Sequence, residues 1–218
     1  SFLTLQLKVL LMKEEKDYIR DISEIRSMME RSSKFRLLSG WAGITAGVLA
    51  LIGAFVAYYI LDFNPGEELQ ISGITPLNSL VVKVLLLATI VLVSAFSAAL
   101  FFSYRKASER GEKIWTPITR RLLTSMFVPM VVGGILIIAL LLNGLIGLAA
   151  PLTLVFYGLG LFSAGSHTLA EVRFLGLVEI VLGLAATFIV EYSLFIWAAG
   201  FGIAHIVYGI YIYIKYEK

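Results

Sequence analysis

Long apolar runs alternate with short polar segments along most of this chain. Runs of about 20 apolar residues can cross the roughly 30 Å hydrocarbon layer of a bilayer. The fourth run is the shortest, and the pattern leaves open whether it crosses completely. The alternation predicts an all-α fold, a polytopic membrane bundle of six transmembrane helices in three hairpins. The predicted spans cover about 37–61, 80–104, 122–142, 152–164, 174–190 and 194–214.

The first 36 residues have a different pattern. Between 13 and 34 the chain is charged throughout, and Tyr18, Ile22, Ile25 and Met29 recur at the spacing of a coiled-coil seam. We therefore predict two domains, a cytoplasmic amphipathic helix within 1–36 and a six-helix transmembrane domain over 37–218. The apolar stripe could pack on the protein's own loops, on a second copy or on lipid. Residues 1–11, which precede Met12, are too short an apolar run to span.

Composition supports the membrane class. Hydrophobic residues make up 59% of the chain and charged residues only 15%, whereas soluble domains are about one-quarter charged. The mean hydropathy is +0.89. The chain has no cysteine, which rules out disulfides and thiolate metal sites.

The distribution of basic residues predicts the topology. All of the 18 Lys and Arg residues except Lys83 fall before the first span, in the 105–121 loop, at Arg173 or at the C-terminus. The positive-inside rule then places both termini in the cytoplasm, and we expect a bacterial inner membrane. Lys83 lies one turn inside the second span, where a lysine typically extends its ammonium to the head groups. The basic residues form no nucleic-acid motif, so we expect lipid as the partner.

The last two spans each place one ionisable residue between glycines. Glu179 lies in GLVEIVLG at 176–183, and His205 lies in GIAHIVYG at 202–209. Each is 13 residues from Tyr192, near the break between the two helices, so an antiparallel hairpin sets them at nearly equal depth. Glycine faces allow helices to approach closely in lipid. We therefore predict a Glu179–His205 contact, with the packing glycines Gly176, Gly183, Gly202 and Gly209, and a similar small-residue face at Gly43 and Gly47.

This candidate polar pair allows three interpretations. An ionisable group in mid-membrane costs roughly 2.5–3.5 kcal/mol on insertion scales and is usually paired or hydrated. Glu179 and His205 could form a hydrogen-bonded pair that holds two helices in register. They could instead relay protons or ions, or contribute to a ligand or metal site.

A second group, His167, Glu171 and Arg173, precedes the fifth span. His167 and Glu171 are spaced i, i+4, but one His and one Glu supply too few ligands for zinc. The alternative interpretation is a helix start with His167 or Thr168 near its cap. We predict no metal site and no cofactor.

The last hairpin resembles a known family. RFLGLVEIVLGLAATF at 173–188 and FIWAAGFGIAHIVYGIYIYIKY at 195–216 are similar to the hairpin of HdeD-like acid-resistance membrane proteins. The layout of the whole chain also looks like that of uncharacterised bacterial six-span proteins. The resemblance implies six spans in three hairpins and a stress-related role, and it supplies no catalytic residues.

Missing motifs narrow the function. The chain has no phosphate-binding glycine loop with its lysine, no H-E-x-x-H and no G-x-S-x-G. We expect a non-enzymatic integral membrane protein with a structural, regulatory or stress-related role, and a homo-oligomer or another membrane subunit as further partner. The alternative is a small channel or transporter with Glu179 and His205 in a proton or ion path.

Overall fold

A computed structural model describes Ile22 and residues 39–70, 79–111 and 115–218. The chain divides into two units, 1–34 and 35–218, and the account below concerns the second. The predicted N-terminal amphipathic helix lies outside the described residues except for Ile22, which is helical and exposed.

The described part of residues 35–218 is helical and has no β-strand. Of two short π-helical segments, η1 ends the helix that begins with α2 and η4 lies between α8 and α9, and η2 and η3 are 3-10 turns. The elements are α2 (Gly40–Phe55), η1 (Val56–Ile60), α3 (Pro65–Gln70), α4 (Ser79–Arg110), α5 (Pro117–Leu142), η2 (Ile146–Leu148), α6 (Ala149–Ala164), α7 (Ala170–Phe188), η3 (Val190–Tyr192), α8 (Ser193–Trp197), η4 (Ala198–Ala204) and α9 (His205–Tyr216).

Five of these helical stretches are long and apolar enough to cross a membrane. The five are Gly40–Ile60, Ser79–Glu109, Pro117–Leu142, Ile146–Ala164 and Val190–Tyr216. The fourth stretch is longer than its predicted range because η2 leads directly into α6. Helix α7 has 19 residues but carries Glu171, Arg173 and Glu179, and it is not among the five.

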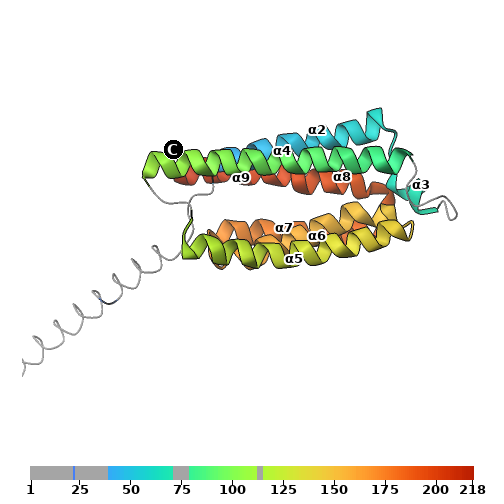
Figure 1. Cartoon of the computed structure of the whole chain (residues 1–218). Helices are drawn as coiled ribbons and strands as arrows, with labels where there is room; N and C mark the ends of the chain where they lie inside the picture. Colours follow the sequence, from blue (N-terminus) through green and yellow to red (C-terminus); the bar gives the residue numbers. More distant parts are fainter. Residues whose placement is uncertain (1–21, 23–38, 71–78, 112–114) are drawn as a thin grey trace, which may run out of the picture. The chain divides into compact units, whose positions relative to one another are not determined.

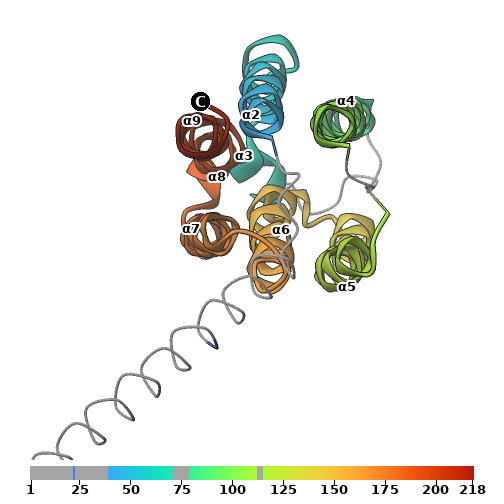
Figure 2. The same cartoon turned by 90° about the vertical axis from the view of Figure 1, so that its left-hand side faces the viewer.

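The helices form two rows of three. Seen end-on, α9, α2 and α4 make one row, and α7, α6 and α5 make the other (Figure 2). Helix α2 packs between α4 and α9, and α6 packs between α5 and α7. The residues of α8, η4 and α9 connect the rows through contacts with α6 and α7. Figure 1 shows α3 at one end of the bundle and the C-terminus at the other, and we name the two ends accordingly.

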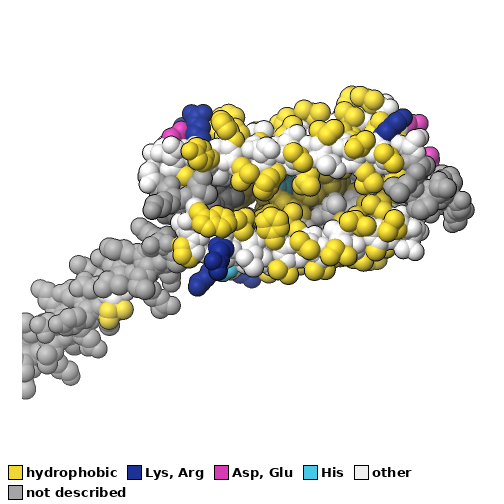
Figure 3. Space-filling model, viewed as in Figure 1, with side chains coloured by type: hydrophobic (Ala, Val, Ile, Leu, Met, Phe, Trp, Pro, Cys, Tyr) yellow, Lys and Arg dark blue, Asp and Glu magenta, His cyan; other side chains and the backbone are white. Residues whose placement is uncertain are grey.

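Charge and apolar surface separate along the bundle axis. Hydrophobic side chains cover its length, whereas basic and acidic side chains gather at the two ends (Figure 3). One apolar core cluster, with Phe63, Val81 and Leu194, lies at the α3 end. Another, with Leu161, Val172 and Ile212, lies at the C-terminal end.

Glycines make two helix interfaces very close. A Cβ on Gly209 of α9 would lie 2.5 Å from the carbonyl oxygen of Gly40 in α2, and one on Gly47 would lie 2.5 Å from that of Gly202. A Cβ on Gly176 of α7 would lie 2.7 Å from the carbonyl oxygen of Gly158 in α6. Backbone therefore meets backbone in the α2–α9 pair and in the α6–α7 pair.

The remaining predicted glycines belong to the same interfaces. Gly43 packs against Gly209, at 3.1 Å from its Cα, and Gly183 packs against the Pro151 carbonyl of α6 at 2.8 Å, both measured from an added Cβ. The glycines that the sequence names as packing positions in the last two spans do lie in close interfaces. Gly176 and Gly183 face α6, and Gly202 and Gly209 face α2, so each span packs these glycines against an earlier helix.

Some boundaries differ from the sequence prediction for local reasons. Helix α4 continues six residues past Tyr104, where Arg105 and Glu109 form an i, i+4 pair at 2.9 Å. Helix α3 lies in a stretch predicted as loop. The Asn64 side chain accepts a hydrogen bond from the Gly66 N–H at 3.2 Å, which satisfies a free donor at the start of α3.

Candidate functional site

The centre of the bundle holds a buried acid and imidazole. Glu179 comes from α7 and is 0% exposed, and His205 begins α9 and is 5% exposed. The His205 Nδ1 atom lies 3.2 Å from Glu179 Oε1. The two side chains thus meet at the depth that counting from Tyr192 predicts.

The hydrogen bonds of His205 define its protonated nitrogen. Its Nδ1 lies 3.1 Å from the Gly200 carbonyl oxygen, which can only accept, so Nδ1 carries a proton. Its Nε2 lies 2.9 Å from the Tyr157 hydroxyl of α6. In the neutral ring Nε2 therefore accepts from the Tyr157 O–H. We call Tyr157, Glu179 and His205 the mid-bundle junction.

The Glu179 carboxyl is less well satisfied than the imidazole. Within the described residues neither Glu179 oxygen has a hydrogen-bond partner, because the Nδ1–H is directed to Gly200. Oε2 occupies the space above Gly200, where an added Cβ would lie only 2.5 Å away. Glu179 Oε1 lies within ion-pair distance of His205 Nδ1 but accepts no hydrogen bond from it, because an ion-pair contact requires only proximity and a hydrogen bond also requires the right angle.

The local backbone makes room for this contact. His205 follows the π-helical segment Ala198–Ala204, whose wider turns accompany an extra residue in the helix, often at functional positions. The His205 side chain bonds to the carbonyl five residues earlier, inside that segment. Phe201, also in it, stacks on the imidazole with ring centroids 5.7 Å apart. Nearer the α3 end, the indole N–H of Trp197 donates to Thr153 Oγ1 at 3.0 Å.

The structure separates the secondary candidates. Glu171 accepts hydrogen bonds from Lys215 Nζ at 2.7 Å and from the Tyr216 hydroxyl at 2.9 Å. The Arg173 guanidinium lies 4.4 Å from the centre of the Phe162 ring. His167 lies in the turn before α7, and its backbone N–H donates to Ala164. These residues therefore form no common site.

The structure also places the start of α7 and the side chain of Lys83. Helix α7 begins at Ala170 with Leu169 as its N-cap, so Thr168 and His167 lie one and two residues before the cap, near the helix start as the sequence indicates. Lys83 is exposed on α4 near the α3 end, in agreement with a lysine that extends toward head groups. No group of three His, Cys, Asp or Glu side chains that could hold a metal ion occurs within the described residues.

A second polar junction at the C-terminal end was not predicted. Glu217 Oε1 accepts hydrogen bonds from Lys106 Nζ and from the Gly40 backbone N–H, each at 2.8 Å. Burial alone would raise the pKa of the Glu217 carboxyl, but these donors outweigh it and hold the pKa below its ordinary value. We call Gly40, Lys106 and Glu217 the C-terminal junction. It joins α2, α4 and the chain end.

Fold and site together define a class, an all-helical protein with stretches long and apolar enough to span a membrane and a buried polar junction at its centre. No protein-family model, no curated protein and no solved structure matches the chain.

Proposed function

We propose that the chain is a non-enzymatic, six-span integral membrane protein in which the mid-bundle junction joins two glycine-packed helix pairs. The observation that carries this proposal is the origin of the three side chains. Tyr157 and Glu179 belong to the α6–α7 pair, and His205 belongs to the α2–α9 pair. A buried polar contact between pairs selects one register, because sliding would leave its groups without partners.

The length and position of α7 support it as the sixth span. Its 19 residues extend about 28 Å at 1.5 Å per residue, close to the hydrocarbon thickness. Glu171 and Arg173 lie in its first turn, at the C-terminal end, and Glu179 is fully buried in the bundle. None of its three charged residues therefore needs to face lipid hydrocarbon in mid-membrane.

Labelling of introduced cysteines tests this topology, and the cysteine-free chain gives a clean background. We expect Ser166→Cys, before α7, and Glu191→Cys, after it, to react with an impermeant maleimide from opposite sides of the membrane. Asn143→Cys, in the turn after α5, should label from the same side as Glu191→Cys. Labelling of Ser166→Cys and Glu191→Cys from one side would exclude α7 as a span.

Basic residues support cytoplasmic termini. The described Lys and Arg residues at the C-terminal end outnumber the single Lys83 near the α3 end, which the positive-inside rule associates with the cytoplasm. They are Arg105, Lys106, Arg110, Arg120, Arg121, Arg173, Lys215 and Lys218. In the labelling experiment the Ser166→Cys side should then be the cytoplasmic side.

A second candidate function is a proton path. It is favoured by buried polar atoms without partners within the described residues, the Glu179 oxygens and the Tyr208 hydroxyl. Tyr208 and Tyr157 pack against the same apolar cluster, which also contacts Tyr216, the partner of Glu171. Tyr208 lies between the mid-bundle junction and the C-terminal end, three residues beyond His205 in α9.

Proton flux into proteoliposomes separates the two functions. The structural proposal predicts no pH-driven flux above that of empty liposomes, and a Glu179→Gln variant with lower thermal stability. A flux that disappears in Glu179→Gln but persists in Glu109→Gln, a carboxylate change at the exposed end of α4, would replace the structural proposal with the proton path.

The cellular setting is part of the same proposal. A bacterial inner membrane and a stress-related role follow from charge distribution and the HdeD-like resemblance. A homo-oligomer through the N-terminal stripe is a further prediction. Ile22 belongs to this stripe and is 65% exposed, so it is available to contact a second copy. Ile22→Asp should then reduce the particle size in detergent, and an unchanged size would exclude that stripe as the oligomer contact.

A further inference from the structure

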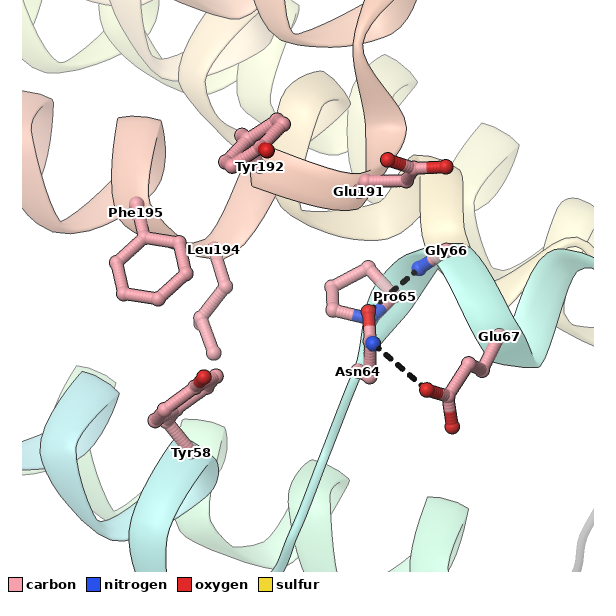
Figure 4. Close-up of a pocket in the computed structure, with 9 residues that line it drawn as sticks. All are labelled: Tyr58, Asn64, Pro65, Gly66, Glu67, Glu191, Tyr192, Leu194 and Phe195. Carbon is pink, nitrogen blue, oxygen red and sulfur yellow. Dashed lines mark hydrogen bonds between the residues drawn. The ribbon is translucent and has the colours of Figure 1, made fainter.

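A pocket at the α3 end differs in chemistry from the rest of the bundle. It has a volume of about 300 Å³ and lies where η1, α3, η3 and α8 meet (Figure 4). Among the described residues, its lining combines aromatic rings and carboxylates and contains no Lys or Arg. This volume is at the lower end of the range of small-molecule sites.

Three aromatic residues form one part of the lining. Tyr58 of η1 and Phe195 of α8 meet edge to face with ring centroids 5.0 Å apart, and Tyr192 lies nearby in η3. In Figure 4 these rings and Leu194 lie on one side, and Asn64 and Pro65 lie on the other. The aromatic residues stay 39–59% exposed, so ring surface remains available to a ligand.

Two carboxylates give the pocket a negative charge. One oxygen of Glu67 accepts a hydrogen bond from the Asn64 side-chain amide at 3.0 Å. Glu191 is exposed and has no hydrogen-bond or ion-pair partner among the described residues. The loop at 62–78 contains no Lys or Arg, so the sequence supplies no neighbouring cation there.

The frame of the pocket is built by close backbone contact. A Cβ on Gly66 would lie 2.7 Å from Cγ and 3.1 Å from Cα of Glu191, so α3 can approach η3 only with glycine there. Asn64 bonds both to the Gly66 N–H and to Glu67, which fixes the start of α3. A frame ordered before binding reduces the entropy lost on binding.

We propose that this pocket binds an organic ammonium group, carried either by a small soluble amine or by a lipid head group. Aromatic faces attract cations electrostatically, and carboxylates add charge complementarity. The pocket lies at the end of the membrane-spanning bundle, where head groups and solution are both accessible. This site is independent of the mid-bundle junction.

Calorimetric titration of the full chain tests the site. The protein is reconstituted in nanodiscs of phosphatidylglycerol, which carries no ammonium group, and titrated with tetramethylammonium chloride against a matched NaCl control. We expect saturable binding that weakens about tenfold or more in Glu191→Gln and in Tyr58→Leu. Glu109→Gln, with its carboxylate at the opposite end of the bundle, should bind like the wild type.

A competition experiment identifies the source of the ammonium group, and two results would overturn the proposal. Competition by short-chain phosphatidylethanolamine would assign a lipid head group, and its absence would assign a soluble amine. No saturable heat beyond the NaCl control in the wild type would overturn the proposal. Binding of tetramethylammonium to Glu191→Gln with wild-type affinity would also overturn the proposal. Because this change is isosteric, it tests the site even if Tyr58→Leu fails to fold.

Discussion

The mid-bundle and C-terminal junctions use the same kind of chemistry in different surroundings. Each brings a carboxyl group to a basic side chain of another helix, within the last hairpin at the centre and across 111 positions at the C-terminal end. Glu217 receives two donors at 2.8 Å, from Lys106 and from the Gly40 N–H. Glu179 has one nitrogen at 3.2 Å and no hydrogen bond within the described residues. The better-satisfied carboxylate is therefore the one at the end of the bundle.

The difference teaches what holds each junction in place. At the C-terminal end, charge-assisted hydrogen bonds are strong enough to bring the chain end to α2 and α4. In the centre, the glycine interfaces fix the helices within each pair, and the acid and imidazole make the contact between the pairs. We therefore expect backbone packing to dominate stability and the C-terminal junction to dominate pH dependence.

The largest expected effect comes from separating α2 and α9. Gly209→Leu would drive its side chain into the Gly40 carbonyl and the Ile44 N–H, and would also move Gly40 away from Glu217. We expect a loss of about 3 kcal/mol or more, and a bundle that aggregates on mild heating in detergent. Size-exclusion chromatography after heating measures the fraction of protein that aggregates.

A matched glycine provides the control for that change. An added Cβ on Gly134 of α5 has nothing within 4 Å, so Gly134→Leu should leave the melting temperature almost unchanged. Equal losses in the two variants would show that any added bulk destabilises this bundle, and the close α2–α9 approach would lose its special role.

The next effect comes from the mid-bundle junction. His205→Leu leaves the Tyr157 hydroxyl, the Gly200 carbonyl and Glu179 without their partner. We expect a loss of about 2–3 kcal/mol in detergent unfolding. Tyr208→Phe removes a buried hydroxyl that has no partner within the described residues, and it should cost less than about 0.5 kcal/mol. If the two variants unfold together, the junction contributes nothing to joining the helix pairs.

The contact of Glu179 with His205 could be predicted because it depends on a local count. Both residues are the same number of positions from Tyr192, and the 1.5 Å rise per residue converts that count into depth. Tyr157 could not be found in this way, since its run carries no other signal. The π-helical segment before His205 also has no pattern of its own.

The glycine partners show where periodicity stops being informative. Gly176 and Gly202 mark faces that pack closely, but a face does not state which helix covers it. The structure pairs Gly176 with Gly158 and Gly202 with Gly47, neither in the last hairpin. The Lys106–Glu217 contact spans 111 positions and joins two segments that the sequence predicts separately, the 105–121 loop and the C-terminal residues. Its only signal was the acidic residue at the end of a basic terminus.

A smaller, pH-dependent effect should come from the C-terminal junction. Because hydrogen bonds lower the pKa of Glu217 in the folded state, its contribution is fully present above the unfolded pKa and disappears as pH falls through the folded pKa. Glu217→Gln should cost about 1–2 kcal/mol near neutral pH. The gap between wild type and variant should begin to close as pH falls through the ordinary carboxyl pKa of 4.5 and should continue to close at lower pH. Melting curves recorded as the pH is lowered measure it, and a gap independent of pH would contradict the assignment.

The smallest effect belongs to the residue pair next to Lys106. Arg105 and Glu109 form an ion pair at 2.9 Å, with side chains 66% and 62% exposed, whereas the Lys106 side chain is only 9% exposed. Water and salt screen the exposed pair, and its order, Arg before Glu, is the less favourable one on a helix. Glu109→Gln should therefore cost about 0.2–0.5 kcal/mol and nothing measurable at high salt. Because Arg105 and Lys106 are adjacent on one helix, burial is the main difference between the two pairs. A cost equal to that of Glu217→Gln would mean that burial does not separate the two kinds of contact.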